Sequence, residues 1–369
     1  MAWWERRPAG WRWLVVGGVV AVLVALPGLV GAVPGRDRPV DAAGLLRRVL
    51  ASERVAYQGY AEARAGLGLP DVPRAGRVVA LLGERTRMRA FVAGPHRWRV
   101  DELTPIGERD LYADGSTTML WDSGERRLTV TQGEAAVRFV RPADLLPPEL
   151  GRRVVAAAEA GEAARLGARR VAGVQALGLR ITPGADGTTL ARADLWADPA
   201  TGLPVRVELT AKGQAGPIVT STFLDLRLGA PDPGNVRFDL PGDADVERDE
   251  APDLARAIDR FSPFVLPDPL AGEPRRTRVA GAAATYGRGY DLVGVLAFPA
   301  RFSPRTRAFL DKVPTRSGPW GEASMIATPL LNGMILERDG VAYALAGTVT
   351  QPVLDRVAAQ LARDGVASR

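Results

Sequence analysis

The N-terminal segment constrains this chain most, because the 21 residues from 13 to 33 carry no charge. About 20 apolar residues in a helix span the hydrocarbon of a bilayer, and a helix satisfies its own backbone hydrogen bonds there. Three arginines precede the run, Arg6, Arg7 and Arg12. By the positive-inside rule, the N-terminus then lies in the cytoplasm. We expect residues 1–34 to form a cytoplasmic stub and a single transmembrane helix, with the remaining chain outside the cytoplasmic membrane.

A cleaved signal peptide is the alternative reading of the same segment. Small residues at 30–32 (Val-Gly-Ala) offer a cleavage site, and Pro27 could end the apolar helix before it. The uncharged run is longer than the apolar region of an ordinary signal peptide, which favours the anchor. The protein is secreted in the cleaved case, so both readings place the main chain outside the cytoplasm.

Charge and composition argue against nucleic-acid binding. The chain of 369 residues has a formal net charge of +6, and its 48 basic residues are all arginine except Lys212 and Lys312. These arginines are interspersed with Asp and Glu, whereas a nucleic-acid binder gathers its basic residues in a stripe or a tail. We therefore expect no nucleic-acid partner.

The inventory of reactive residues is poor. There is no cysteine, and His96 is the one histidine, so thiolate metal sites and Ser-His-Asp triads lack their parts. The glycines at 287–294 do not have the spacing of a dinucleotide-binding loop. The acidic stretch 243–253 lacks the spacing of a calcium loop. We expect no enzyme activity, no metal and no cofactor.

Most of the chain after residue 54 has the pattern of short strands. In the segments 86–93 and 96–102, Met88, Val92, Trp98 and Val100 alternate with charged residues, which predicts an antiparallel sheet with one apolar face. Turn residues separate the runs. The predicted strands are 54–62, 77–82, 86–93, 96–102, 108–113, 117–122, 127–131, 135–140, 176–182, 188–197, 203–210 and 217–227.

Helices are expected at few places. Asp41 is a predicted N-cap before an apolar stripe at helical spacing. Segment 142–169 predicts one or two helices with a proline interruption. After a linker at 246–275 that is rich in Pro and Asp, the residues 276–369 form a small α+β unit, with helices predicted at 303–312 and 351–364.

Several motifs resemble those of one family. The segment 194–209 (DLWADPATGLPVRVEL) is similar to the W-x-D-x-x-T-G-L-P hairpin of the lipoprotein-carrier superfamily, which contains the LolA and LppX carriers and the RseB/MucB sigma-E regulatory proteins. Trp196 then lies in a strand and Asp198 to Gly202 make the turn. Three further segments resemble the family in order and spacing, 88–103, 110–123 and 141–154. Together they cover roughly residues 41–245.

The resemblance implies an α+β fold in which residues 41–245 form a curved, unclosed antiparallel β half-barrel with helices plugging its concave side. It also implies an apolar cavity that takes acyl chains or apolar polypeptide segments. The unit 276–369 resembles the smaller C-terminal domain of the regulatory branch, and its segment 340–361 resembles the strand–helix end of such proteins.

The predicted cavity residues are large apolar side chains of the strands. An unclosed sheet would expose them to a ligand, although buried aromatic residues more often serve a core. They are Met88, Trp98, Val100, Tyr112, Met119, Trp121, Phe139, Trp196 and Phe223.

Two functions follow from the resemblance. The first is a membrane-tethered regulatory sensor that binds the extracytoplasmic part of a membrane protein, such as an anti-sigma factor, and responds to a lipid or acyl-chain ligand. The second is a lipid or lipoprotein carrier of the LolA/LppX type. The tether and the extra domain favour the first, because a carrier has to leave the membrane.

Overall fold

The computed structural model describes residues 40–69, 76–105, 107–133, 140–250, 260–300 and 313–368. The predicted anchor at 1–34, the predicted helix at 303–312 and Phe139 lie outside these residues. In the described part of the chain, no helix is both long and apolar enough to cross a membrane.

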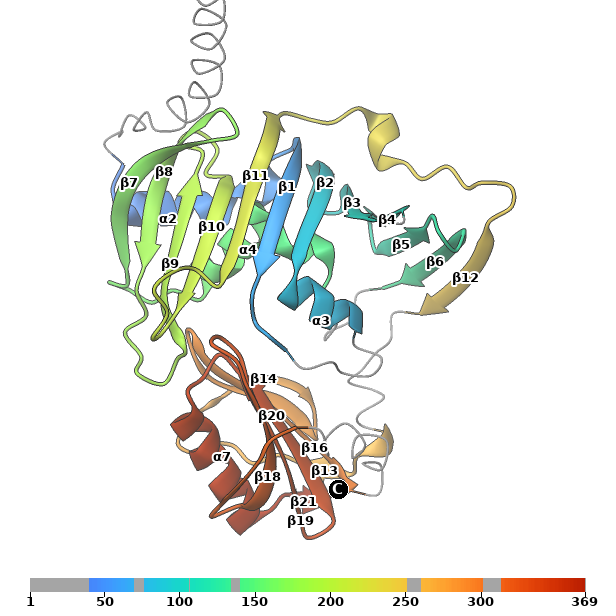
Figure 1. Cartoon of the computed structure of the whole chain (residues 1–369). Helices are drawn as coiled ribbons and strands as arrows, with labels where there is room; N and C mark the ends of the chain where they lie inside the picture. The colour runs from blue at the N-terminus through green and yellow to red at the C-terminus, as the bar shows by residue number, and fades with distance from the viewer. Residues whose placement is uncertain are drawn as a thin grey trace, which may run out of the picture.

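The first sheet has twelve strands in the order β12-β6-β5-β4-β3-β2-β1-β11-β10-β9-β8-β7 (Figure 1). Its strands are β1 (Tyr57–Ala65), β2 (Arg85–Gly94), β3 (Arg97–Thr104), β4 (Gly107–Asp114), β5 (Thr117–Asp122), β6 (Arg127–Gln132), β7 (Ala163–Val171), β8 (Val174–Ile181), β9 (Leu190–Ala197), β10 (Pro204–Ala211), β11 (Val219–Leu228) and β12 (Asp245–Glu250).

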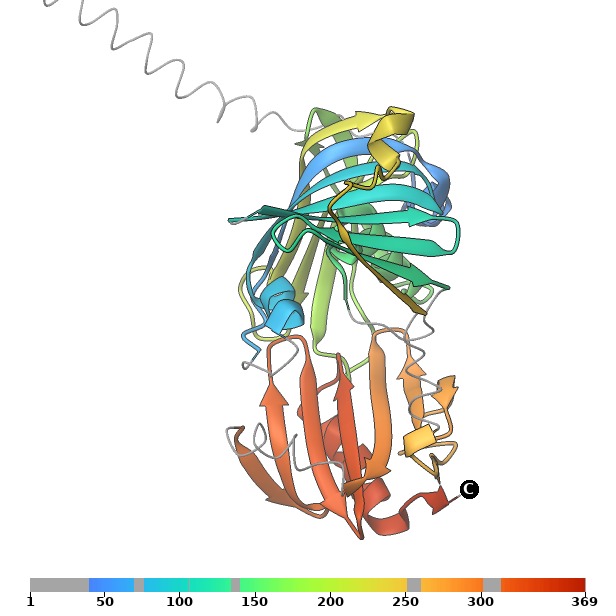
Figure 2. The same ribbon diagram turned by 90° about the vertical axis from the view of Figure 1, so that its right-hand side faces the viewer.

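This sheet is curved and does not close. Neighbouring strands pair antiparallel throughout, except that β12 joins β6 in parallel. β12 and β7 are the two edges and are not paired with each other. Figure 2 shows the curvature of this sheet. The predicted antiparallel unclosed sheet is therefore confirmed.

Helices fill the concave side. They are α2 (Ala42–Ala51), the 3₁₀ turn η3 (Pro142–Leu145) and α4 (Pro147–Ala156). A further helix, α3 (Gly76–Gly83), lies beside β1. The carboxylate of Asp41 accepts a hydrogen bond from the Gly44 amide at 2.7 Å, as predicted for the N-cap of α2. Leu45 and Val49 of α2 are fully buried against the sheet. Burial of this apolar face holds α2 in place.

Strand alternation gives the sheet two different faces. Met88 and Val100 point to the concave side and are buried in the core with Leu146, which lies between η3 and α4. The neighbouring Arg99 and Asp101 point to the convex side, because successive side chains of a strand face opposite ways. The charged residues that alternate with the apolar ones along β2 and β3 therefore lie on the outer face of the sheet.

A strap crosses part of that outer face. After β11 the chain forms the 3₁₀ turn η4 (Pro233–Val236), which contacts β2 and β3, and ends in β12. Phe238 of the strap packs edge-on against Tyr112 at 5.2 Å and tilted against Trp121 at 5.9 Å between ring centroids. We call residues 229–250 the strap; Figure 2 shows it running diagonally across the strands. Phe238 thus covers the outer face of β4 and β5 at these two rings.

The turn between β9 and β10 docks on α2. The Asp198 carboxylate accepts hydrogen bonds from the amides of Ala200 and Thr201, at 3.0 and 2.7 Å. Gly202 has a φ of +74°, and the Arg48 guanidinium of α2 donates to the Pro199 carbonyl at 2.5 Å. The predicted hairpin with Asp198 to Gly202 as its turn is confirmed. The turn formed by this motif is the part of the hairpin that contacts α2.

The second sheet belongs to the C-terminal domain, which lies below the first sheet in Figure 1. Its order is β14-β15-β16-β20-β19-β18-β17, and a two-stranded sheet pairs β13 with β21. The strands are β13 (Phe264–Val265), β14 (Arg275–Ala280), β15 (Ala283–Arg288), β16 (Asp291–Pro299), β17 (Thr315–Gly318), β18 (Gly321–Ala327), β19 (Asn332–Arg338), β20 (Val341–Gly347) and β21 (Ala367–Ser368).

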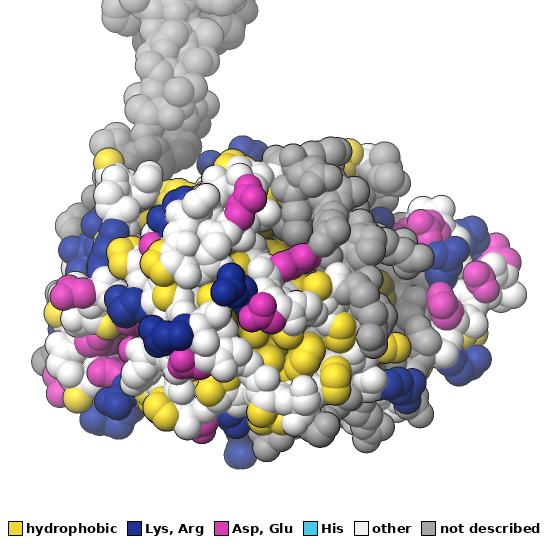
Figure 3. All heavy atoms as spheres, turned by 90° about the horizontal axis from the view of Figure 1, so that it is seen from below, with side chains coloured by type: hydrophobic (Ala, Val, Ile, Leu, Met, Phe, Trp, Pro, Cys, Tyr) yellow, Lys and Arg dark blue, Asp and Glu magenta, His cyan; other side chains and the backbone are white. Residues whose placement is uncertain are grey.

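The helix α7 (Gln351–Asp364) packs on one face of this sheet through Leu354, Val357 and Leu361, each fully buried. The helix predicted at 351–364 is confirmed. The other face carries the half-buried Leu296 and Phe298. Seen from below, hydrophobic side chains gather near the middle of the molecule, with charged side chains around them (Figure 3).

Three predicted elements differ from the structure. The run 77–82, predicted as a strand, lies in α3. A short apolar run fits the helical period and the strand period equally well. As a helix, this run buries Leu81 beside β1. The predicted helical segment 142–169 ends at Ala156, and its last part is β7. The predicted linker 246–275 contains β12, which belongs to the first sheet, and β13.

Candidate functional site

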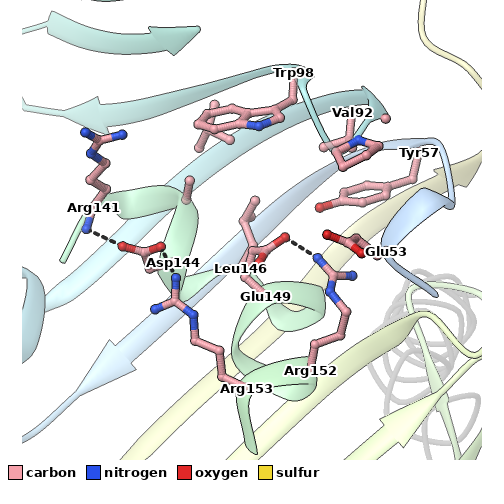
Figure 4. Close-up of a pocket in the computed structure, with 14 residues that line it drawn as sticks. Glu53, Tyr57, Val92, Trp98, Arg141, Asp144, Leu146, Glu149, Arg152 and Arg153 are labelled. Atoms are coloured by element: carbon pink, nitrogen blue, oxygen red, sulfur yellow. Dashed lines mark hydrogen bonds and ion pairs between the residues drawn. The ribbon is translucent and has the colours of Figure 1, made fainter. Parts of the chain in front are cut away.

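A pocket of about 160 Å³ lies between the concave face of the sheet and the helices η3 and α4 (Figure 4). One wall comes from β1, β2 and β3, and the opposite wall comes from η3 and α4. It is lined by Glu53, Tyr57, Val92, Gly94, Pro95, Trp98, Val100, Arg141, Ala143, Asp144, Leu146, Glu149, Arg152 and Arg153.

The sheet wall is apolar and aromatic. Trp98 and Val92 face each other across the β2–β3 pair, so both point into the pocket. Tyr57 is 3% exposed and packs edge-on against Phe223, with 5.6 Å between ring centroids. Burial raises the pKa of the Tyr57 phenol above its ordinary value, so this side chain stays neutral. This wall can take the apolar part of a ligand.

The helical wall is charged and internally paired. Arg152 pairs with Glu149 one turn earlier in α4, and Arg153 pairs with Asp144 of η3. The Asp144 carboxylate also accepts a hydrogen bond from the Arg141 amide at 2.8 Å, which fixes the start of η3. Pro147 and Pro148 stand at the first positions of α4, where proline favours the start of a helix. A polar group of a ligand would replace one partner in these ion pairs.

The pocket is smaller and more charged than the cavity predicted from the sequence. Pockets for drug-sized ligands are usually about 300–1,000 Å³. η3 and α4 pack on the concave face against β2, β3, β10 and β11, with Leu145, Leu146, Val154 and Val155 in the core. In this state the pocket admits one part of an amphiphile, and a larger occupant would have to displace α4.

The structure divides the predicted cavity residues between two faces. Met88, Val100, Trp98 and Phe223 lie on the concave side. Of these, Trp98 and Val100 line the pocket. Met88 and Phe223 are 0% and 1% exposed and belong to the core beside it.

The other described members of the set lie on the opposite face. Tyr112 pairs with Arg99 across β3 and β4, and Met119 and Trp121 share this face by their register with β4. Trp196 points away from the core residue Leu195, and its indole donates to the Gly167 carbonyl at 3.0 Å. Phe238 of the strap covers Tyr112 and Trp121. The Arg169 guanidinium lies over the Trp196 ring at 4.9 Å, and Trp196 also belongs to the buried cluster that contains Leu203 and Val205. Met119 is half-buried.

Sequence reasoning missed most of the pocket wall. The charged residues of η3 and α4 gave no signal, because a pair such as Glu149 and Arg152 looks like an ordinary exposed helix pair. Tyr57 had a signal in strand parity, because it shares the face of Ala61 and Met88 across β1 and β2. Val92 is on the predicted apolar face with Met88, but it is not among the predicted cavity residues.

An acidic cluster on the convex face is the one group of the described residues with metal-like spacing. Oxygens of Asp101, Glu108 and Asp110 lie within 4.8 Å of one another. The guanidiniums of Arg89 and Arg99 lie among them, the latter 3.1 Å from Asp110. These arginines already supply the positive charge that a cation would bring, and we assign no ion to the cluster.

The Asp110 carboxyl in this cluster holds its proton at unusually high pH. Burial, and next the facing Asp101 carboxylate, raise the pKa of Asp110 from 3.8 to about 7. A pKa that is higher in the folded than in the unfolded state gives stability that is complete below about pH 4 and is lost as the pH rises to about 7.

Asp110→Asn is therefore expected to stabilise the protein at pH 8 by about 1–2 kcal/mol and to have little effect at pH 4. At about 1.4 kcal/mol per pKa unit the shift corresponds to about 4 kcal/mol, and the lost ion pair with Arg99 offsets part of it. Urea unfolding of both proteins at several pH values measures this. A gain of the same size at both pH values would contradict the assignment of the proton to Asp110.

No family model matches the chain, and no curated protein matches it either. Solved structures are similar at low identity. MucB in complex with MucA(peri) is 18% identical, covers 86% of this chain and 97% of its own, and has a TM-score of 0.49. A second structure, the complex of Pseudomonas aeruginosa MucA/MucB, gives the same identity and TM-score over 96% of that chain.

A LolA superfamily protein from Nitrosomonas europaea is 12% identical, covers 54% of this chain and 99% of its own, and has a TM-score of 0.26. At these scores we infer nothing about function from the likeness.

Proposed function

We propose that this protein is a non-catalytic binding protein outside the cytoplasmic membrane, which takes an amphiphilic ligand between its curved sheet and α4. The observation that carries the proposal is the two-walled pocket: Trp98 and Val100 offer an apolar surface, and Arg152 faces them with a charged group. Removing an apolar chain from water against the sheet wall would drive binding. The charged wall would hold the polar end.

We further propose that the bound ligand regulates a protein partner. The partner class comes from the sequence resemblance: the extracytoplasmic part of a membrane protein such as an anti-sigma factor. The apolar N-terminal run would keep the chain at the membrane surface, where both a lipid-like ligand and such a partner are found. Co-purification of the full-length chain from membranes with an identified membrane protein tests this, and repeated purification of the chain alone would count against it.

Two tryptophans provide the test of the ligand site. Trp98→Ala is expected to weaken binding of dansylaminoundecanoic acid, a fluorescent amphiphile, at least tenfold, because it removes much of the apolar wall. Trp121→Ala is the matched control: it deletes the same side chain from the convex face, under Phe238. We expect its affinity to stay within twofold of the wild type. Full-length chain in nanodiscs, with empty discs subtracted, is titrated with the probe.

Equal loss of affinity in both variants would show that the probe does not bind in the pocket.

The carrier function is distinguished by release from the membrane, because a carrier would leave the membrane with its lipid. Fractionation after cell lysis, followed by native mass spectrometry of the soluble fraction, would reveal such a form. Finding the chain soluble and lipid-loaded would replace the regulatory proposal by the carrier.

A further inference from the structure

The two domains are joined by a short β-bridge. Thr188 of the first domain pairs with Val349 of the second, and the Thr189 amide donates to the Thr348 carbonyl at 2.9 Å. The Thr350 amide donates back to the Gly187 carbonyl at 2.6 Å. Thr189 also donates its hydroxyl to the Leu330 carbonyl at 2.6 Å. These bonds fix the C-terminal domain against the β8–β9 connection.

Tyr290 extends this junction to the pocket. It lies in the turn between β15 and β16, and its hydroxyl donates a hydrogen bond to the Val154 carbonyl of α4. Its own carbonyl accepts from the Thr348 hydroxyl at 2.8 Å. Burial raises the pKa of the Tyr290 phenol, so the hydroxyl keeps the proton it donates. One residue therefore contacts both α4 and the interdomain bridge.

The contact is close and lies at the end of a helix. The Val154 carbonyl accepts a hydrogen bond from the Ala157 amide at 3.2 Å, which closes the last turn of α4, and the Tyr290 hydroxyl is its second donor. The preceding Gly289 has a φ of +48°, and a Cβ built there would lie 3.2 Å from the Ala157 carbonyl oxygen. The β15–β16 turn is thus seated directly on the C-terminus of α4.

The same helix carries the charged wall of the pocket. Arg152 and Arg153 immediately precede Val154, so at about 1.5 Å per residue the wall and the Tyr290 contact lie within one helical turn. On its other side, α4 lies tight on β10: a Cβ at Gly151 would lie 2.7 Å from Pro204. Displacing the wall would therefore move the Val154 carbonyl with it.

We infer that Tyr290 is a positioning residue of the pocket, through which the C-terminal domain sets the place of α4 and pocket occupancy alters how the two domains are held together. This inference rests on the proposed ligand binding. Coupling between two sites is reciprocal, so loosening the Tyr290 contact changes the ligand affinity, and filling the pocket changes the domain arrangement.

Tyr290→Phe tests this by removing a single hydroxyl. The matched control is Tyr286→Phe: the Tyr286 hydroxyl donates to the Pro267 carbonyl at 2.6 Å wholly inside the C-terminal domain. In the unliganded full-length chain, we expect amide hydrogen exchange in residues 152–158 to become at least fivefold faster in Tyr290→Phe and to stay unchanged in Tyr286→Phe. Dansylaminoundecanoic acid should bind Tyr290→Phe with an affinity changed at least threefold, and Tyr286→Phe as the wild type.

Domain placement is read from two spin labels. Because the chain has no native cysteine, Glu125→Cys and Arg338→Cys, both exposed, can be labelled without background. The probe should shift the distance between the labels in the wild type and in Tyr286→Phe, and much less in Tyr290→Phe. Unchanged exchange in Tyr290→Phe, equal changes in both variants, or a probe-induced shift that survives in Tyr290→Phe overturns the inference. If the wild type binds no probe, the proposed function fails, whereas faster exchange in Tyr290→Phe alone still supports the positioning role.

Discussion

Replacing Gly202 with alanine is expected to lower the free energy of unfolding by about 3–5 kcal/mol, the range of severe single substitutions. Gly202 has a φ of +74°, which costs a residue with a Cβ about 1–2 kcal/mol. A Cβ there would also lie 2.2 Å from the Arg48 carbonyl oxygen in the backbone of α2. The helix would have to retreat, and with it the fully buried Leu45 and Val49.

Gly213 is the matched control for this variant. Its φ of +76° is nearly the same, but a Cβ there would meet nothing within 4 Å. Gly213→Ala should therefore show only the backbone cost. Urea unfolding followed by tryptophan fluorescence gives both values. If the free energy of unfolding fell no more in Gly202→Ala than in Gly213→Ala, the close approach of the turn to α2 would not be the reason for the glycine at 202.

Arg99→Met should lower stability by about 3 kcal/mol at pH 8 and by clearly less at pH 5. Breaking a buried ion pair from one side costs about 3–5 kcal/mol, because an uncompensated charge stays behind. Here Asp101 and Asp110 are 1% and 6% exposed and face each other across β3 and β4. The Arg99 guanidinium lowers the pKa of both carboxyls, against their burial. Without it their pKa values rise further, so at lower pH protons replace the lost charge.

Arg87→Met is the control on the same face. Arg87 pairs with Glu62 at 3.4 Å, but half of its side chain is exposed, and exposed pairs contribute at most about 1 kcal/mol. Denaturation curves of both variants at pH 5 and pH 8 provide the comparison. The part of the Arg99→Met effect that comes from its stacking on Tyr112, at 5.0 Å from the ring centroid, does not depend on pH. A loss that is equal at both pH values would assign the whole effect to this stacking.

Local patterns fixed those elements whose signal lies within a few residues. Asp41 caps α2 and the segment 351–364 forms α7, as the helical patterns predict. The hairpin around Asp198 follows from turn chemistry, since a carboxylate that bonds the next amides and a glycine at positive φ define the turn. The alternation around Met88 predicts a two-faced sheet, and the structure has one.

Only the tertiary structure decided which side of that sheet is a pocket and which a covered exterior. Strand alternation shows that the sheet has two faces, but it does not show which of them becomes the concave face. In this protein both faces are partly buried. α4 covers one, and the strap brings Phe238 onto Tyr112 and Trp121 on the other. Apolar residues therefore occur on both, which is why the aromatic residues predicted for one cavity divide between the faces. The charged wall of α4 faces β1 to β3, and Tyr290 contacts Val154, only because segments far apart in the chain come together, and no local pattern encodes such contacts.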